Sequence, residues 1–374
     1  MKMKKGWWLV AIMAAALGSL SSAPSRAASP MLEQATDLAG LVMFMESHAP
    51  GMILVAVQGD DQIVRSYGET ASGSKQEPNG DSLFRLNSVT KVFTTEALVS
   101  LVADGAARLT DPLQRFADHV QVPQFEGRPV TLLDLATHTG AMPREMGEAP
   151  AGAEPRSWPT RNDRWKWISE YSLPWAPGSI AAYSNIGFDL LADAVETADG
   201  KPYPVLLKSR IIGPLGMGDT TFAPTPDQCT RLMKGSGLGA STACEDTSAT
   251  AGSGGLFSTG NDMARWLRHN LEPSETLALG HAVYRQRQSL KAAIGFDEGT
   301  AMSGLGLGWV YLASDGARPA LLTKSGGGVG FMSYAAFAPG RDVAVFVVAN
   351  RADFGMFGPL VGAVNNMIGS LATR

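Results

Sequence analysis

A serine and a lysine lie three residues apart at the start of an apolar segment. Ser88-Val89-Thr90-Lys91 opens a run in which apolar residues recur at helical spacing, which predicts a helix from residue 89 to 104. At this separation the two side chains share one helix face, so the Lys91 amine can reach the Ser88 hydroxyl. A buried lysine that loses its proton easily acts as a base, and one that stays charged favours the alkoxide. The pair therefore predicts an acyl-transfer nucleophile, with positive potential from the helix N-terminus near the oxyanion.

Ser-x-x-Lys is a weak motif when taken alone. The same spacing at Ser72–Lys75 precedes Gln-Glu-Pro-Asn-Gly, which indicates a turn, and the pair at Ser88 is also compatible with a solvated helix start. Two triplets add to it: Tyr183-Ser184-Asn185 precedes a helical run, and Lys324-Ser325-Gly326 ends a predicted strand. Each alone could simply cap a helix or end a strand. The three motifs in this order, each in a suitable element, predict one catalytic site.

These motifs resemble those of the serine penicillin-recognising enzymes of the class C beta-lactamase type, a family that also contains low-molecular-mass DD-peptidases and some esterases. The resemblance covers nearly the whole chain after residue 27. The stretch TLLDLATHTGAMPRE is similar to the family's Leu-Leu-x-His-Thr-x-Gly-x-Pro region. Longer stretches such as RSYGET, FDLLADA and LGLGWVY are similar to its D-alanyl-D-alanine carboxypeptidase and endopeptidase branch. The third triplet has serine where the family often has threonine, and both residues offer a hydroxyl.

The resemblance implies catalytic roles for three residues and a substrate-binding role for a fourth. Ser88 would attack a carbonyl and form an acyl-enzyme, and Asn185 would bind the substrate amide near the acylated serine. Lys91 and Tyr183 would share the proton transfers. The sequence leaves open which of these two is the base.

The third motif is expected to receive the substrate. The resemblance implies that Lys324 and Ser325 maintain the electrostatics of the site and hold the substrate's carboxylate, and that the backbone N–H groups of Ser88 and Gly327 form the oxyanion hole. The glycines from Gly326 onward also have a physical reason, because a strand edge without side chains lets an extended peptide pair with it. A flexible strand end is the alternative interpretation.

Strands and a helix are predicted near both ends of the chain. Residues 31–47 have helical spacing, and GMILVAVQGDDQIVRSYGE predicts two strands that meet at residues 59–61. Four strands are predicted near the C-terminus, in LGLGWVYLA, ARPALLTKSG, GFMSYAAFAP and RDVAVFVVAN, followed by a helix over 357–371. We therefore expect an α/β (α+β) fold whose antiparallel sheet is built from both termini and flanked by helices. The sheet domain would comprise residues 31–110 and 290–374, with a mostly helical lobe of residues 111–289 inserted between them.

The first 27 residues have the layout of a secretory signal peptide. Three lysines precede an apolar run from Trp7 to Leu20, and small residues follow up to Ala27. This run is shorter than the roughly 20 residues of a membrane span, and the alternative interpretation is an uncleaved membrane anchor. Cleavage would remove four basic residues and no acid, taking the formal net charge from -4 to about -8. The acidic balance argues against a nucleic-acid partner, and the expected location is the periplasm, with or without peripheral contact with the inner membrane.

Cysteine and histidine usage narrows the chemistry further. The only two cysteines, Cys229 and Cys244, predict a disulfide in an exported protein, the alternative being two buried free thiols. The five histidines are scattered and show no metal-binding spacing, so we expect no metal and no other cofactor. His138, within Thr-His-Thr-Gly, is interpreted as a structural turn residue.

Four of the eight tryptophans fall in SWPTRNDRWKWISEYSLPW. Most such clusters are packing, but Trp165 or Trp175 could instead form a wall of the cleft near Tyr183 that contacts stem peptide or sugar.

The leading functional interpretation, implied by the resemblance, is a serine DD-carboxypeptidase and endopeptidase that acts on peptidoglycan stem peptides and binds beta-lactams. The alternatives are a class C-type beta-lactamase, an esterase on the same scaffold, and a non-catalytic peptidoglycan-binding module. The last has no need for both a nucleophile and a base.

Overall fold

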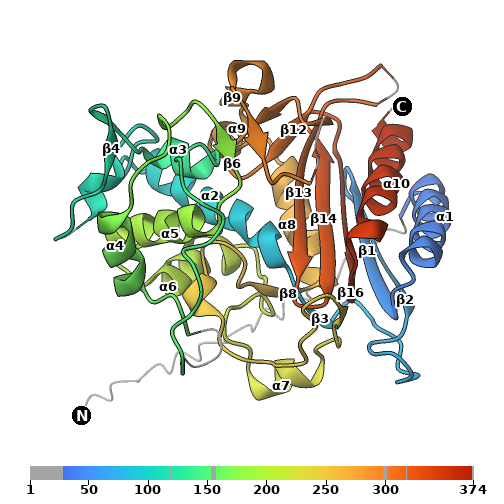
Figure 1. Cartoon of the computed structure of the whole chain (residues 1–374). Coiled ribbons are helices and arrows are strands. Elements are labelled where there is room, and N and C mark those ends of the chain that lie inside the picture. Colours follow the sequence, from blue (N-terminus) through green and yellow to red (C-terminus); the bar gives the residue numbers. More distant parts are fainter. Residues whose placement is uncertain (1–27, 118, 153–156, 298–300, 317, 373–374) are drawn as a thin grey trace, which may run out of the picture.

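The computed structural model describes residues 28–372 except 118, 153–156, 298–300 and 317 (Figure 1). The predicted signal peptide, residues 1–27, lies outside the described residues. Within them, no helix has the length and apolar character needed to cross a membrane.

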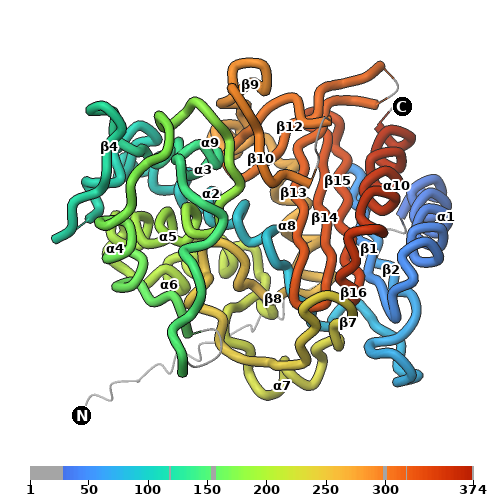
Figure 2. The backbone as a smooth tube through the Cα atoms, viewed as in Figure 1, coloured from blue at the N-terminus to red at the C-terminus, as the bar shows by residue number. Residues whose placement is uncertain are grey.

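An eight-stranded antiparallel sheet, in the order β2-β1-β15-β14-β13-β12-β11-β9, forms the centre of the molecule. The predicted hairpin is present as β1 (Gly51–Gln58) and β2 (Asp61–Gly68). Strand β1 pairs with β15 (Val343–Ala349) along its length, so strands from the two ends of the chain lie side by side (Figure 2). The predicted fold class, with a sheet built from both termini, is confirmed.

One edge of a central strand is left open next to the third motif. Strand β13 (Leu321–Gly328) pairs with β14 (Phe331–Ala338) over nearly its whole length. On its other side it pairs with β12 (Val310–Leu312) only through Leu321–Thr323. In the part of the chain that is described, residues 324–328 therefore have no strand partner on that side.

Helices cover both faces of the sheet because its strands alternate side chains between two cores. In β14, Met332, Tyr334 and Ala336 pack in the core under α1 (Pro30–Ser47) and α10 (Phe354–Ala372). Phe331, Ala335 and Phe337 face the opposite core, which includes α8 (Gly260–Leu271) and α2 (Thr90–Ala103). Figure 1 shows α1 and α10 side by side on one face of the sheet.

A group of helices lies beside the sheet and carries part of the site. Helix α2 packs against α5 (Asn185–Asp199), which in turn contacts α3 (Leu132–Ala136), α4 (Arg161–Glu170) and α6 (Tyr203–Leu207). The boundaries predicted for the helical lobe, 111 and 289, stay a prediction. Helix α8 falls between them in sequence but packs on strands β1 and β15 of the sheet.

The remaining elements are short. They are β3 (Leu83–Arg85), β4 (Gln124–Phe125), β5 (Arg128–Pro129), β6 (Ala181–Ala182), α7 (Pro226–Thr230), β7 (Ser236–Gly237), β8 (Phe257–Thr259), α9 (Glu275–His281), β9 (Arg285–Gln286), β10 (Ala293–Ile294), β11 (Gly304–Leu305) and β16 (Arg351–Ala352), with short 3-10 or π turns at Asn87–Val89, Leu113–Phe116, Lys208–Ile212, Ser248–Thr250 and Arg287–Ser289. The predicted disulfide is present: Cys229 and Cys244 are bonded, with their Cα atoms 5.7 Å apart.

Candidate active site

Ser88 lies in a 3-10 turn, Asn87–Val89, that leads directly into α2. Asn87 has a positive φ of 49°, a conformation that asparagine tolerates better than most residues. Its Nδ2 donates to the carbonyl oxygens of Gly328, at 2.9 Å, and Phe331, at 3.2 Å. The side chain of Asn87 therefore ties the turn that carries Ser88 to the β13–β14 hairpin, and does not cap the helix.

Lys91 is fully buried one turn further along, where α2 begins. Its Nζ donates to Asn185 Oδ1 and to the carbonyl oxygen of Ser253, both at 2.7 Å, and lies 3.3 Å from Ser88 Oγ. Burial lowers the pKa of Lys91, and the positive charge of Lys324 lowers it further. With two N–H groups directed at carbonyl oxygens, the lone pair of a neutral amine faces the Ser88 hydroxyl.

Tyr183 lies among three cations. Lys91 Nζ and Lys324 Nζ are each 4.9 Å from its ring centroid, and the Arg144 guanidinium is 4.8 Å away. Burial opposes ionisation, but the charges of Lys324 and Lys91 and hydrogen bonds with Ser88 and Lys91 outweigh it and lower the pKa of Tyr183 to about 8. A phenolate is therefore accessible within about one pH unit of neutrality.

His138 packs against the ring of Tyr183. Its ring stacks on Tyr183 with 4.4 Å between centroids, and its Nδ1 accepts the backbone N–H of Ser184 at 3.0 Å. Burial, together with the charges of Lys324, Lys91 and Arg144, lowers the pKa of His138 well below its ordinary value. The imidazole is thus neutral near pH 7 and can accept that bond.

Asn185, at the start of α5, uses both ends of its amide. The oxygen accepts from Lys91, and Nδ2 donates to a Glu145 carboxylate oxygen. This arrangement fixes which end of the amide faces the lysine. Glu145 is a neighbour that the sequence motifs did not indicate.

The third motif forms the opposite wall. Lys324 and Ser325 are almost fully buried on β13. Lys324 Nζ lies 3.4 Å from the Tyr183 hydroxyl, and Ser325 Oγ donates to Asp297 at 2.6 Å. Glycine is required at Gly326, because an added Cβ would lie 2.4 Å from the Leu86 carbonyl oxygen and 3.2 Å from the Ser88 nitrogen.

The structure brings the predicted residues of all three motifs together: Ser88, Lys91, Tyr183, Asn185, Lys324, Ser325 and Gly326, with Gly327 next on the same strand edge. Sequence reasoning missed Asn87, Glu145, Ser253, Asp297 and Asp189. One signal was available, because Asp189 follows Asn185 at i+4 and so lies on the same face of the predicted helix.

The tryptophan cluster divides into two environments. Trp175 lines a cavity of about 330 Å³ beside Tyr183, together with Arg144 and Tyr171. Trp165 is buried in the main core and borders a different cavity, beside Phe116 and His119. Trp175 is therefore the tryptophan placed to line the cleft, whereas Trp165 is a packing residue.

The chain belongs to the beta-lactamase family, whose model matches residues 31–361. It is 44% identical over 339 residues to the D-alanyl-D-alanine-carboxypeptidase/endopeptidase AmpH of Escherichia coli, which covers 88% of this chain and 87% of that protein. A beta-lactamase of Escherichia coli is 24% identical over 327 residues, covering 81% and 84% of the two chains.

A solved structure is similarly close. The beta-lactamase/D-alanine carboxypeptidase from Yersinia pestis, complexed with citrate, superposes with a TM-score of 0.86 at 40% identity. The match covers 91% of this chain and 98% of that one. The resemblance inferred from the three motifs is confirmed.

Proposed function

We propose that this protein is a serine hydrolase, a DD-carboxypeptidase and endopeptidase that acts on peptidoglycan peptides through an acyl-enzyme at Ser88. The observation that carries the proposal is the buried Lys91 amine, 3.3 Å from Ser88 Oγ and held by two carbonyl oxygens. The similarity to AmpH over most of the chain supports the choice of substrate.

In the proposed reaction, Ser88 Oγ attacks the carbonyl of the scissile amide while its proton passes to Lys91 or to the Tyr183 phenolate. The backbone N–H groups of Ser88 and Gly327 bind the oxyanion. As the intermediate collapses, the departing amine takes up the proton and an ester to Ser88 remains. Water then hydrolyses the ester by the same steps and restores the serine.

The free edge of β13 supports binding of an extended peptide. Within the described part of the chain, residues 324–328 have no strand partner on the side away from β14, and the glycines there add no bulk. Lys324 and Ser325 would hold the substrate's carboxylate. Because the Ser325 hydroxyl now donates to Asp297, an arriving carboxylate would compete with Asp297 for it.

The location that suits this activity is the periplasm, reached through the predicted signal peptide. Peripheral contact with the inner membrane is supported by four exposed apolar side chains at helical spacing on α1: Leu38, Leu41, Val42 and Met45. We expect the processed protein to float with phosphatidylcholine vesicles and the double variant Leu38→Glu, Met45→Glu to remain at the bottom. Equal flotation of the two proteins would remove the membrane from the proposal.

The proposal is tested by intact-mass spectrometry of the processed protein during incubation with benzylpenicillin, with the drug assayed in parallel. We expect a lasting penicilloyl adduct that is lost in Ser88→Ala, and release of D-alanine from a stem pentapeptide by the unmodified enzyme only. Penicillin that disappears without a lasting adduct would favour the beta-lactamase alternative. If the protein neither forms an adduct nor consumes penicillin, an esterase or a binding module would be favoured.

A further inference from the structure

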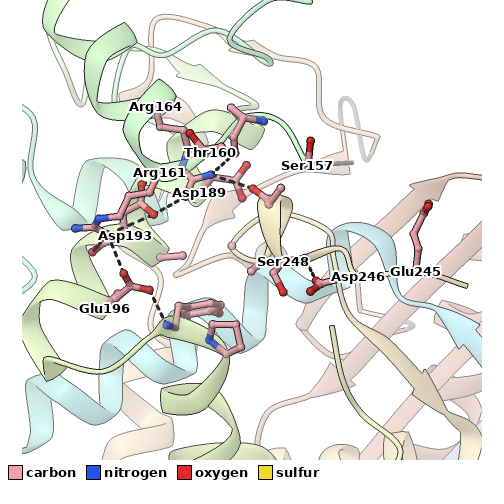
Figure 3. Close-up of a pocket in the computed structure, with 17 residues that line it drawn as sticks. Ser157, Thr160, Arg161, Arg164, Asp189, Asp193, Glu196, Glu245, Asp246 and Ser248 are labelled. Carbon is pink, nitrogen blue, oxygen red and sulfur yellow. Dashed lines mark hydrogen bonds and ion pairs between the residues drawn. The ribbon is translucent and has the colours of Figure 1, made fainter. Parts of the chain in front are cut away.

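A cavity of about 610 Å³ lies beside α5 and α4 (Figure 3). Helix α5 lines it with Asp189, Asp193 and Glu196, and α4 adds Arg161 and Arg164. The segment from residue 245 to 252 forms another wall, and the next residue along, Ser253, accepts a hydrogen bond from Lys91. The segment that forms this wall therefore continues directly into the residue that contacts Lys91.

Two carboxylates one helical turn apart in this cavity have opposite surroundings. Asp193 accepts from Arg164 through both oxygens, at 2.8 and 2.6 Å. Asp189 accepts only from Ser253 Oγ, at 3.1 Å, and among the described residues its other oxygen is buried without a hydrogen-bond partner. Asp193 thus has a complete structural pairing with an arginine, and Asp189 does not.

Ser253 connects Asp189 to the catalytic lysine. Its hydroxyl donates to Asp189 Oδ2, and its carbonyl oxygen accepts from Lys91 Nζ at 2.7 Å. The carboxylate therefore orients the residue whose carbonyl holds the amine in place.

Charge links the same groups. Asp189 faces Lys91 on α2, Arg164 on α4, Asp193 on its own helix and Tyr203 on α6. Burial raises the pKa of Asp189 to about 7, against the opposing charges of Arg164 and Lys91. Near neutral pH this group changes between a neutral form and a charged form that favours the Lys91 ammonium.

We propose that Asp189 is a positioning residue that, through Ser253 and through its own charge, sets the protonation balance of the Lys91–Tyr183 pair. The inference rests on the proposed function and adds a control on the base of that reaction.

The test is the pH profile of acylation by benzylpenicillin, measured by mass spectrometry in the full chain from pH 5 to 9. For Asp189→Asn, we expect the midpoint of the acidic limb to move by about half a pH unit or more, because a charge close to Lys91 is gone. A shift to lower pH identifies deprotonation of Lys91 as limiting. A shift to higher pH identifies Tyr183, whose phenolate depends on a charged Lys91. Both shifts support the proposal.

Glu196→Gln is the matched control. Glu196 lines the same cavity and also loses a negative charge, but its carboxylate bonds the Tyr203 backbone N–H and Arg161 instead of Ser253. We expect the midpoint of its acidic limb to stay within about 0.2 pH units of the midpoint of the unmodified enzyme, because the Glu196 charge is more exposed and better screened than that of Asp189. An equal shift in both variants would mean a general effect of cavity charge and would overturn the proposal.

Ser253→Ala provides a second route if Asp189→Asn does not fold. This variant keeps the carbonyl that Lys91 contacts and removes only the hydroxyl, so a smaller shift of the midpoint in the same direction is expected. Asp189→Glu keeps a carboxylate and should therefore have a pH profile closer to that of the unmodified enzyme than Asp189→Asn has. A merely structural role for Asp189 would lower the melting temperature and the rate without moving the midpoint, which would overturn the inference. If the unmodified protein forms no adduct at all, the proposed function fails first.

Discussion

The site lies between a helical wall, which carries Ser88 and Lys91 at the start of α2, and a strand wall, which carries Lys324 and Ser325 on β13. Each wall presents a buried lysine, but the two lysines are held differently. On the helical wall, Lys91 Nζ has three oxygens within 3.3 Å, from Ser88, Asn185 and Ser253. On the strand wall, the one hydrogen bond of Lys324 Nζ among the described residues is to Tyr183, at 3.4 Å.

This difference assigns different tasks to one residue type. A lysine whose amine is held by two carbonyl oxygens beside the nucleophile has a fixed position and suits proton transfer. A lysine with donors to spare can bind an incoming anion. The helical wall is therefore built for chemistry and the strand wall for reception of the substrate.

Replacement of the two lysines tests this assignment most strongly. Lys91→Ala is expected to slow acylation by about a thousandfold or more, because the proton acceptor and its hydrogen bonds are lost. Lys324→Ala should raise KM about tenfold for peptides with a free terminal carboxylate and less for amidated ones. It should also lower kcat, although less than Lys91→Ala does, because the Lys324 charge lowers the pKa of Tyr183. Steady-state kinetics with matched acid and amide peptides separates the two. Equal losses in kcat from both variants would mean that the walls do not divide the work.

The contact between the walls is tested by two neighbouring glycines. In Gly326→Ala the new methyl would lie 2.4 Å from both the Leu86 carbonyl oxygen and Ser333 Oγ. We expect it to lower the free energy of unfolding by about 3 kcal/mol, because backbone must move. Gly327→Ala meets only Met332, at 3.0 Å, and that flexible side chain can shift, so the loss should stay below about 1 kcal/mol. Urea denaturation measures both, and similar values would show that the walls are not in tight contact.

Asn87 joins the walls through hydrogen bonds. Asn87→Ala removes the bonds to Gly328 and Phe331 and places alanine at a positive φ, so we expect a loss of about 2 kcal/mol in unfolding free energy and tenfold slower acylation. Asn87→Gly is the control, since glycine adopts this φ without strain and lacks only the side chain. The rate should fall similarly in both variants while the glycine variant is the more stable. An unchanged rate in Asn87→Gly would mean that the link does not position Ser88.

Asp297 gives the smallest expected effect, confined to the strand wall. Its carboxylate accepts from Ser325 Oγ, so Asp297→Ala should free that hydroxyl and remove a repelling charge, lowering KM for peptides with a terminal carboxylate by about threefold. Asp297→Asn keeps an acceptor for that hydroxyl, so its KM should lie between the KM values of the unmodified enzyme and of Asp297→Ala. Acylation by a neutral thioester should be unchanged. A higher KM in Asp297→Ala would show instead that Asp297 helps to bind the substrate.

Much of the fold and the centre of the site follow from local patterns. The two segments of residues 51–68 that meet at residues 59–61 predicted β1 and β2, and the helical spacing at 31–47 and 357–371 predicted α1 and most of α10. The Ser88 and Lys91 pair was also predictable, because their spacing on one helix sets their distance whatever the rest of the chain does. Asn87 was not, since its bonds reach residues more than 240 positions away in the sequence.

The sequence by itself determined which chemical groups this protein carries and the elements that present them, because side-chain type and periodicity are properties of short segments. Only the tertiary structure decided which charges surround Tyr183, that Asp297 takes the Ser325 hydroxyl, and that Asp189 reaches Lys91 through Ser253. Those outcomes depend on burial and on contacts between distant segments. The same aspartate or lysine changes its proton affinity with the partners and the solvent that the folded chain gives it.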